Sequence, residues 1–264
     1  MTIRIGFICP THRALDLHSY TETALRTFFE TTPDGVAIVV DDGTPGWSKD
    51  YEERLALIAR ECHGSIRTFH FPRRHGLTRS WNWGLHKCRE LGLDYAVAGN
   101  NDIIFTPKWY EGMLHALQHY VMVGPLSNAP GITAKGKQEI GEYYPNYKVT
   151  DNAEYLQLVA ETIHQNNLGK VVESEVNGFF QMCSMDGWQS NMYSQKEFYR
   201  PVNNYTSKGR RNPTPLMTLN EDEWQGRATA KKLKMAIALS SFIFHYRAVT
   251  RGDRYKRGQW YRKT

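Results

Sequence analysis

The stretch YAVAGNNDIIFTP, residues 95–107, places three hydrogen-bonding side chains between two apolar segments. Residues 95–98 and 103–105 have the composition of buried strands. Asn100, Asn101 and Asp102 stand between them. An Asx turn between two strands explains this pattern, because Asn and Asp side chains hydrogen-bond their own backbone. A metal and phosphate site at the end of a core strand explains it equally well, because Mg²⁺ binds one or two carboxylates together with substrate phosphates.

Strand-like and helix-like patterns alternate over about the first 120 residues. Strand-like runs occupy residues 3–9, 35–46 (ending in two aspartates and a turn), 65–71 and 95–98, and helical patterns occupy 19–30, 50–63, 77–92 and 107–119. This alternation is typical of βαβ units. It predicts an α/β fold with a mixed, mainly parallel sheet that is flanked by helices on both faces.

Polar residues follow three of the predicted strands. They form the clusters 10–13, 41–44 and 100–102. In parallel sheets, ligands bind beyond the carboxyl ends of the strands. Three polar strand ends at one edge of a sheet are hard to explain as three simple turns, and they therefore predict a binding site at that edge.

The second half of the chain is less regular. Residues 124–150 are rich in Gly, Pro, Asn and Tyr and predict a long loop, which is more often functional than idle. A helix is expected at 152–167, a strand at 176–185, a loop at 199–218 and a helix from residue 220. We find no repeat and no interdomain linker, so we expect a single domain, residues 1–264.

The composition is that of a globular protein. The chain has 264 residues, of which 41% are apolar, and no apolar run approaches the ~20 residues that span a bilayer. The sequence suggests no signal peptide. The four cysteines form no C-x-x-C pair, and Cys9 and Cys183 lie in apolar runs, as reduced core residues do. These features predict a soluble, cytoplasmic protein without a transmembrane segment.

The net charge of +6 is concentrated in residues 247–264, which hold seven basic residues and one acidic residue. Tyr255, Trp260 and Tyr261 lie among these charges. A basic segment interleaved with aromatic residues can bind nucleic acid, an anionic surface or a polyphosphate ligand. A solvated C-terminal face explains the same composition.

Two further candidates lie in the first half. Asp41 and Asp42 follow a buried run, where an aspartate either caps a turn or accepts hydrogen bonds from a nucleobase or ribose. Gly76 precedes a predicted helix that carries Asn82 and Gly84. The glycines suit either a loop and helix packing, or a backbone that approaches a nucleotide.

The second half offers two more candidates. Glu221, Asp222 and Glu223 begin a predicted helix, where carboxylates are stabilising by about 0.3–1 kcal/mol each. Because adjacent carboxylates repel one another and raise their pKa values, the cluster also suits a general base. His245 ends an apolar run and is followed by Arg247 and Arg251, which are suitable neighbours for a metal–diphosphate site. A lone histidine in this position is more often a core residue.

In this order, the motifs resemble those of the family 2 glycosyltransferases, which have the GT-A fold. GFICPTHR resembles the first strand of that family, and IVVDDGT is similar to its nucleotide-binding second strand. HGLTRSWNWG keeps the family's glycine and asparagine spacing, with Trp81 where an arginine is common. AGNNDIIFTP resembles the Asp-x-Asp strand, with Asn100 in place of the first aspartate. NEDEWQGR resembles the segment with the catalytic base, and FIFHYRAVT resembles the late strand with a metal-binding histidine.

The resemblance implies transfer of a sugar from a nucleotide-sugar donor, with a UDP-sugar expected, and with inversion at the anomeric carbon. It implies Mn²⁺ or Mg²⁺ held by Asp102 and His245, with help from Asn100, and a catalytic base at Glu221 or Asp222. It assigns about residues 1–120 to nucleotide binding, 121–246 to the acceptor and 247–264 to a basic tail. The residues expected at the nucleotide are Pro10, Thr11, His12, Arg13, Asp41, Asp42, Gly76, Arg79, Asn82, Asn100, Asn101, Arg247 and Arg251.

The acceptor is not specified by these motifs, and a glycan, a lipid-linked hydroxyl and a nucleic acid all remain open. A sugar-nucleotide or nucleotidyl transferase on a similar sheet is a rival interpretation. A nucleic-acid-binding protein that uses the basic aromatic tail is another. This interpretation merges with sugar transfer if the acceptor is a hydroxylated base in DNA.

Overall fold

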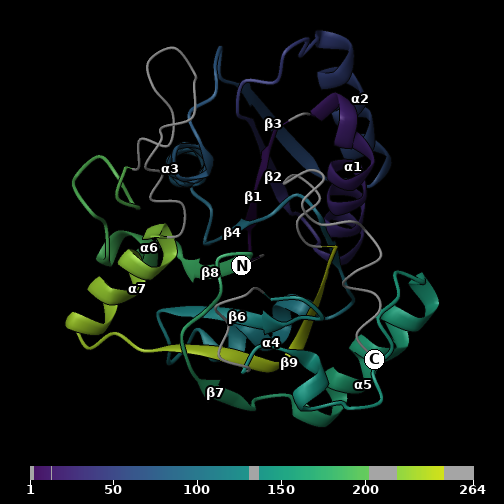
Figure 1. The fold of residues 1–264 in the computed structure, drawn as a ribbon, viewed down its shortest axis with the longest axis vertical. Coiled ribbons are helices and arrows are strands. Elements are labelled where there is room, and N and C mark those ends of the chain that lie inside the picture. The colour runs from purple at the N-terminus through teal and green to yellow at the C-terminus, as the bar shows by residue number, and fades with distance from the viewer. Residues whose placement is uncertain (1–2, 13, 131–136, 202–218, 247–264) are drawn as a thin grey trace.

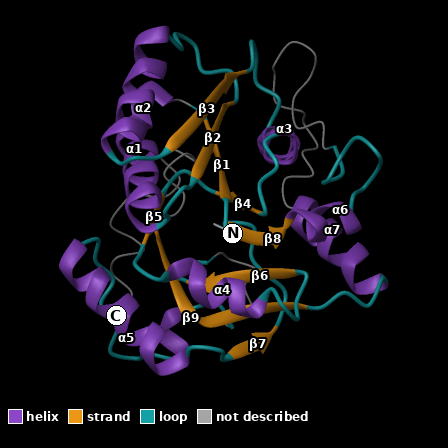
Figure 2. Ribbon diagram, turned by 180° about the vertical axis from the view of Figure 1, so that it is seen from behind, coloured by secondary structure: helices purple, strands orange, loops and turns teal. Residues whose placement is uncertain are grey.

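The computed structural model describes residues 3–12, 14–130, 137–201 and 219–246. Within these ranges the strands form one mixed sheet in the order β3-β2-β1-β4-β8-β6-β9-β5, and β7 pairs with β9. Helices cover both of its faces (Figures 1 and 2). The predicted α/β class, with a mainly parallel sheet flanked by helices, is confirmed.

The first half forms the parallel part of the sheet. Its strands are β1 (Ile5–Thr11), β2 (Val36–Asp41), β3 (Ser65–His70) and β4 (Tyr95–Gly99). β1 lies between β2 and β4, and all of these pairings are parallel. The residues of β1 and β2 are fully buried because helices pack on both sides of them.

Three helices connect these strands, namely α1 (Ala14–Thr31), α2 (Lys49–Glu61) and α3 (Leu77–Glu90). Leu25 and Phe28 of α1 pack with Leu55 of α2 on one face of the sheet. α3 packs on the other face, through the core cluster that contains Trp81 and Leu85. α2 begins where its pattern predicts, because the Ser48 side chain accepts a hydrogen bond from Tyr51 N and acidic residues lie in the first turn.

The second half completes the sheet with strands that run in both directions. It contains β6 (Met122–Leu126), η1 (Ile140–Glu142), α5 (Ala153–Asn167), β7 (Val171–Glu173), β8 (Phe180–Ser184), α6 (Met185–Ser190), α7 (Leu219–Ala230) and β9 (Met235–His245). β5 (Ile103–Phe105) and α4 (Trp109–Ala116) precede these elements and end the first half. β8 lies between β4 and β6 and is antiparallel to both. β9 is parallel to β6 and antiparallel to β5 and β7.

Some details differ from the expectations. β1 continues through Pro10 and Thr11, beyond the expected end of the strand at residue 9, and residues 122–126 form strand β6, although a loop was predicted from residue 124. Gly124 and Pro125 make this segment look like a loop in the sequence. Gly124 is needed in the strand because a Cβ there would lie 2.5 Å from Val176 Cγ1. Pro125 immediately precedes a shift in the register between β6 and β9, which suits a residue that cannot donate to a ladder.

Close packing explains one glycine of α3 that was ambiguous in the sequence. A Cβ on Gly84 would collide with the Ile8 side chain of β1. Gly84 therefore brings α3 close to the sheet.

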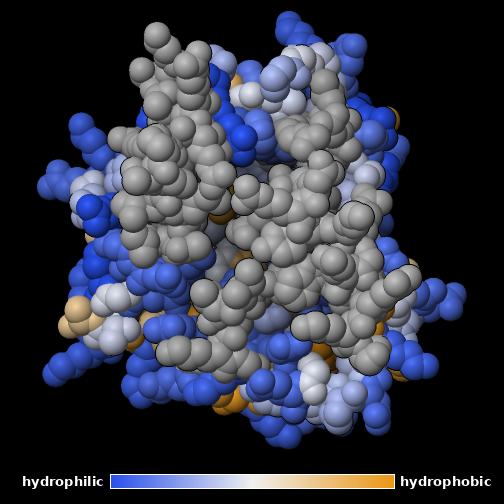
Figure 3. Space-filling model, in the orientation of Figure 1, coloured by the Kyte–Doolittle hydropathy of each residue, from blue (hydrophilic) through white to orange (hydrophobic). Residues whose placement is uncertain are grey.

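The cysteines and the surface agree with a globular protein. All four cysteines are free, and Cys9, Cys88 and Cys183 are buried, as predicted for Cys9 and Cys183. Hydrophilic residues cover most of the described surface on the face seen in Figure 1, with scattered apolar ones (Figure 3). No helix within the described ranges combines the length and the apolar character that a bilayer crossing requires.

Candidate functional site

The predicted meeting of polar strand ends is confirmed by the strand pairing. Thr11 at the end of β1 pairs in register with Asp41 at the end of β2. β4 runs parallel to β1, so the segment 100–102 leaves the sheet at the same edge. We refer to the carboxyl ends of β1, β2 and β4, together with residues 100–102, as the polar edge.

His245 reaches the polar edge from the other half of the chain. In the β5–β9 ladder, Ile103 pairs with His245, and Tyr246 N donates to Asp102 O at 2.9 Å. Asp102 Oδ1 lies 3.3 Å from His245 Nε2, and both side chains are about 5% exposed. Asn100 Nδ2 lies 3.2 Å from the same imidazole nitrogen. The three polar groups thus converge on one point.

The orientation of His245 is fixed by groups that the sequence did not indicate. Its Nδ1 lies 2.7 Å from the carbonyl oxygen of Ala129 and must donate there, because a carbonyl only accepts. In the neutral imidazole, Nε2 then carries the lone pair that a metal requires. The Phe179 ring stacks on the imidazole at 4.9 Å, and Asn128 hydrogen-bonds the backbone of His245 in both directions.

These residues fit a divalent cation that is shared with a ligand. Asp102 offers a carboxylate, His245 an imidazole lone pair, and Asn100 an amide oxygen once its amide group is turned. Among the described residues, no group of three or more His, Cys, Asp or Glu side chains could hold a metal ion. The remaining ligands would come from water or phosphate, as is usual for Mg²⁺.

Asn101 does not face this point. Its Nδ2 donates to Thr21 Oγ1 of α1 at 3.0 Å, and its side chain is buried. The GNND sequence therefore has two roles, since Asn100 and Asp102 lie beside His245 while Asn101 ties the turn to α1. A metal and phosphate site at the stretch 95–107 stays a prediction.

Asp41 is occupied by contacts within its own turn. Thr44 N donates to Asp41 Oδ2 at 2.7 Å, and Thr44 Oγ1 donates to Oδ1. His70 Nδ1 lies 2.8 Å from Oδ2 and stacks on Trp47. The Asp41 carboxylate is fully buried, and its hydrogen bonds with Thr44 make it the cap of this turn. A contact of Asp41 with a nucleotide stays a prediction, and its geometry favours a structural role.

Asp42 holds the loop that precedes α3. Oδ1 accepts from His75 N at 2.6 Å and from Gly76 N at 2.9 Å. Burial raises the pKa of Asp42 to about 6, against the opposing effects of these hydrogen bonds and of Arg74. Gly43 follows with a φ of 73°, and a Cβ there would collide with the backbone of residues 73–74. The two loops therefore pack tightly at the polar edge.

The other nucleotide candidates of the first half have mixed surroundings. Pro10 and Thr11 are buried in β1, and His12 Nδ1 donates to Asp42 O at 3.1 Å. Arg79 is exposed, and its guanidinium lies 5.9 Å from the centre of the Phe71 ring. Arg13, Arg247, Arg251 and the tail lie outside the described residues.

Asn82 is committed to the backbone of Tyr199. Its Nδ2 donates to Tyr199 O at 3.0 Å, and its Oδ1 accepts from Tyr199 N at 2.8 Å. Tyr199 Oη in turn donates to Gln181 Oε1 at 2.5 Å, and Gln181 Nε2 donates to Val176 O. The geometry gives Asn82 a positioning role, because both polar atoms of its amide pair with the main chain of Tyr199. Its contact with a nucleoside stays a prediction.

The same network reaches helix α7. Gln225 Oε1 accepts from Val176 N at 2.7 Å, and Gln225 Nε2 donates to Val176 O at 2.8 Å. Arg227 anchors α7 further, through Glu223, Asn191 O and Phe198 O. Buried hydrogen bonds thus connect α3 in the first half to α7 in the second half.

Glu221 and Asp222 lie on different faces of α7. Glu221 precedes Gln225 and Ala228 by four and seven residues, so it shares their inward face. A Cβ on Gly178 would lie 2.6 Å from Glu221 Cδ and Oε1, so the carboxylate lies against Gly178. Residue 179, the next in the chain, stacks on His245. Asp222 is exposed, and its pKa is raised by loss of hydration and by the charge of Glu175.

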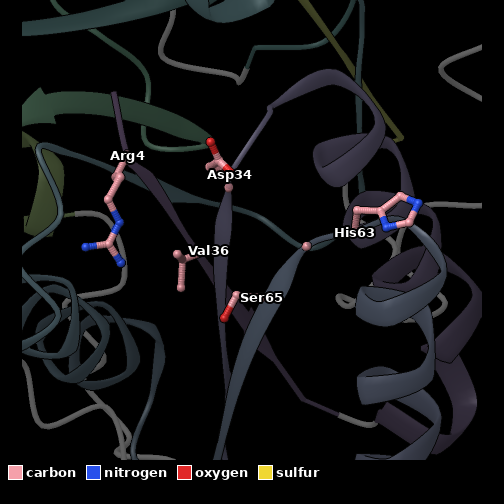
Figure 4. Close-up of a pocket in the computed structure, with 7 residues that line it drawn as sticks. Arg4, Asp34, Val36, His63 and Ser65 are labelled. Atoms are coloured by element: carbon pink, nitrogen blue, oxygen red, sulfur yellow. The ribbon is translucent and has the colours of Figure 1, made fainter. Parts of the chain in front are cut away.

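A separate hollow of about 310 Å³ lies at the opposite edge of the sheet, where the parallel strands begin (Figure 4). Val36 and Ser65, the first residues of β2 and β3, line it together with Arg4. Asp34 and His63 also line it and have left-handed backbones, with φ of 56° and 55°. His63 follows the end of α2, where such a conformation is common. The hollow is not continuous with the polar edge.

No protein-family model and no curated protein sequence matches this chain. A solved structure does match it, the crystal structure of GalNAc-T7 with UDP, GalNAc and Mn²⁺, with a TM-score of 0.54 and 11% sequence identity. The match covers 92% of this chain and 44% of GalNAc-T7, so the chain spans less than half the length of that relative. At this identity the likeness shows the fold alone, which is the GT-A fold. Assignment to family 2 in particular stays a prediction.

Proposed function

We propose that this protein is a metal-dependent, inverting glycosyltransferase that moves a sugar from a nucleotide-sugar donor, with UDP as the expected nucleotide, to an acceptor hydroxyl. The observation that carries the proposal is the convergence of Asp102, His245 and Asn100 at the polar edge of a GT-A-type sheet. The solved structure with this fold holds UDP and Mn²⁺. In open α/β sheets this edge is where ligands bind.

The polar edge provides the donor site. Thr11, His12 and the loop that Asp42 holds would surround the nucleoside, and α3 begins at Gly76 with its N-terminus at this edge. The amino end of a helix favours a negatively charged group, because its N–H groups are unpaired and its dipole is positive there. These residues bind and orient the donor.

Asp102 and His245 would hold Mn²⁺ or Mg²⁺ against the diphosphate. When bound, the cation supplies Lewis-acid stabilisation of the leaving diphosphate. Ala129 O keeps His245 in the tautomer that can bind a metal, and Phe179 holds the plane of the ring. The protein's contribution is therefore a preformed pair of ligands with fixed orientation.

Glu221 would act as the general base. It faces the interior of the second half beside Gly178, whereas Asp222 faces solvent. A carboxylate in this place can take the proton from the acceptor hydroxyl as the oxygen attacks the anomeric carbon. The buried contacts of Gln225 with Val176 hold the turn of α7 that follows Glu221.

Isothermal titration calorimetry tests the donor site. Wild-type protein is titrated with UDP, GDP, ADP, CDP and TDP, with and without Mn²⁺, and Asp102→Ala is compared with Asp34→Asn as a matched control. Asp34 lies at the opposite edge with a φ of 56°, a conformation that Asn also tolerates. We expect Mn²⁺-dependent binding of one nucleotide, UDP first, that Asp102→Ala weakens at least tenfold and Asp34→Asn leaves unchanged. A nucleotide affinity that changes neither with Mn²⁺ nor in Asp102→Ala, or no nucleotide binding at all, would refute the proposal.

A further inference from the structure

One long stretch of this chain has only basic charge. Residues 62–89 contain no Asp or Glu and six basic residues, Arg67, Arg73, Arg74, Arg79, Lys87 and Arg89. The stretch folds into β3, the loop that follows it and α3. Its cations are therefore brought to one side of the molecule, next to the edge strand β3.

The fold places three of these cations, Arg67, Arg79 and Lys87, beside one group of aromatic rings. The rings of Phe69 and Trp83 stack at 4.2 Å with an interplanar angle of 18°, and Lys87 Nζ lies 5.6 Å from the centre of the Trp83 ring. Arg67 precedes Phe69 by two residues, so it lies on the same face of β3. Arg79 lies against Phe71, the residue that follows β3. We name the surface formed by Arg67, Arg73, Arg79, Lys87 and the Phe69–Trp83 stack the α3–β3 face.

The α3–β3 face is exposed and positively charged. Arg67, Arg73 and Arg79 are exposed, and the Lys87 side chain is 30% exposed. Two carboxylates interact with the charges of this face. Glu90 pairs with Lys87, and Arg79 lowers the pKa of Glu197 against the larger, opposite effect of burial. The cations of the face therefore outnumber these carboxylates.

We propose that the α3–β3 face binds the phosphodiester backbone of a nucleic acid. Three of its four cations are arginines, and the planar guanidinium pairs with phosphate oxygens through two parallel hydrogen bonds. α3 has 14 residues and is about 20 Å long, which matches about six nucleotides of one strand at 3.4 Å each. The Trp83 ring already contacts Phe69 and Lys87, so recognition rests on phosphate contacts and is independent of base sequence.

The composition of the face disfavours an anionic membrane as the partner. Of the large apolar side chains that are exposed in the described residues, only Leu77 belongs to this stretch. An interfacial membrane site needs an apolar surface that enters the lipid beside its cations. The α3–β3 face carries the cations without that surface.

The face begins at the polar edge. The loop from residue 71 to Gly76 is held by Asp42, and α3 runs from there over β2 and β1, with Trp83 against Phe69 of β3. A nucleic acid on this face would therefore lie next to the proposed donor site. The charges of the α3–β3 face are sufficient to argue for nucleic-acid binding. A role of the nucleic acid as the acceptor of the sugar rests on the function proposed above.

Fluorescence anisotropy with a labelled duplex DNA of about 20 base pairs tests the proposal. The full chain is titrated between about 50 and 200 mM salt, since each phosphate contact contributes about −0.9 to the slope of log K against log salt. The triple variant Arg67→Gln, Arg73→Gln, Lys87→Gln is compared with Lys49→Gln, Arg54→Gln, Arg60→Gln. The second set removes three exposed cations from α2, on the other face of the sheet.

We expect the α3–β3 variant to bind DNA at least tenfold more weakly, with a salt slope smaller by about 3, while the α2 variant stays within twofold of wild type. Equal losses in both variants would show a general charge effect and overturn the proposal. Unchanged binding in the α3–β3 variant would place DNA elsewhere on the chain, and tight binding to anionic lipid vesicles without DNA binding would favour a membrane. Nucleotide calorimetry on the double variant Arg67→Gln, Lys87→Gln, which leaves the loop held by Asp42 unchanged, tests the donor site separately.

Discussion

Asp102 Oδ1 lies 3.3 Å from His245 Nε2 because β5, which begins directly after Asp102, pairs with the end of β9. The two side chains come from opposite halves of the chain, and main-chain hydrogen bonds set their distance. The backbone positions of both residues are therefore fixed by the sheet. This arrangement suits a site that must present metal ligands in a fixed geometry.

Replacing Asn100 with Asp should raise the affinity for Mn²⁺ in the absence of nucleotide. Asn100 Nδ2 lies 3.2 Å from His245 Nε2, so a carboxylate there would add a second charged ligand at the same point. Because affinity for hard divalent cations rises with the charge of the ligands, we expect an increase of about tenfold by calorimetry. Asn101→Asp adds the same charge in the same turn but faces Thr21, and an equal increase in that variant would contradict the assignment.

Gly178→Ala should impair sugar transfer while the protein stays folded. The new Cβ would lie 2.6 Å from Glu221 Cδ, so the carboxylate must move away. Transfer should fall at least tenfold, measured as release of nucleotide from the donor, with donor affinity unchanged. Gly226→Ala in α7, the helix that carries Glu221, meets no atom within 4 Å and should gain about 0.5–1 kcal/mol of stability without loss of transfer. Full activity in Gly178→Ala would argue against Glu221 as the base.

Glu221→Gln and Asp222→Asn should differ sharply. Loss of a general base typically costs a factor of about 10²–10⁴ in the chemical step, so Glu221→Gln should lose that much transfer and still bind the donor. Asp222→Asn should retain most of its activity, because the side chain faces solvent. The same kinetic assay on both variants decides between them, and the reverse order of effects would make Asp222 the base.

Asn82→Ala should reduce the free energy of unfolding by about 2 kcal/mol, because two buried groups of Tyr199 lose their hydrogen-bonding partners. Urea denaturation measures this loss. Ser80→Ala is the matched control, since this buried hydroxyl of α3 has no hydrogen-bonding partner among the described residues and its removal should cost little. A loss of nucleotide affinity in Asn82→Ala at full stability would restore its predicted contact with the nucleoside.

The stability of wild-type protein relative to Asp42→Asn should fall as pH rises. Burial raises the pKa of Asp42 to about 6, so the folded protein holds this proton more tightly than the unfolded chain does. The stabilisation is complete below the unfolded pKa of about 4 and is lost as pH rises through about 6. Between these limits the difference should decline by about 3 kcal/mol, measured by urea denaturation. A difference that does not depend on pH would show that the N–H groups of His75 and Gly76 balance the effect of burial, and one that rises with pH would show that they outweigh it.

The sequence predicted those features that depend on residue periodicity. The strands β1 to β4 and their helices follow from apolar patterns, and the meeting of Thr11 and Asp41 follows from parallel pairing. Strand β6 could not be predicted, because Gly124 and Pro125 occupy a strand only through contacts with distant segments. The distinction between Glu221 and Asp222 was available in principle, because Gln225 and Ala228 mark the inward face of α7.

Contacts with the backbone were beyond the reach of the sequence. Ala129 fixes the tautomer of His245 through its carbonyl oxygen, and every residue type has such an oxygen. Asn82 was expected at a nucleoside, yet its amide pairs with the main chain of Tyr199. In both cases the partner is a main-chain group, which does not depend on the residue type and so cannot be recognised in the sequence. Side-chain types therefore indicated where the site lies, but not what holds each group in place.

The sheet also interleaves the two halves of the chain. β8 is inserted between β4 and β6, and β5 of the first half pairs with β9 of the second. A cut between α4 and β6 would leave each fragment with unpaired strand edges, which favour aggregation. Asp102 would belong to one fragment and His245 to the other. If the proposed metal site is correct, binding of Mn²⁺ would then report the reassembly of the two fragments, and the protein could serve as a split reporter.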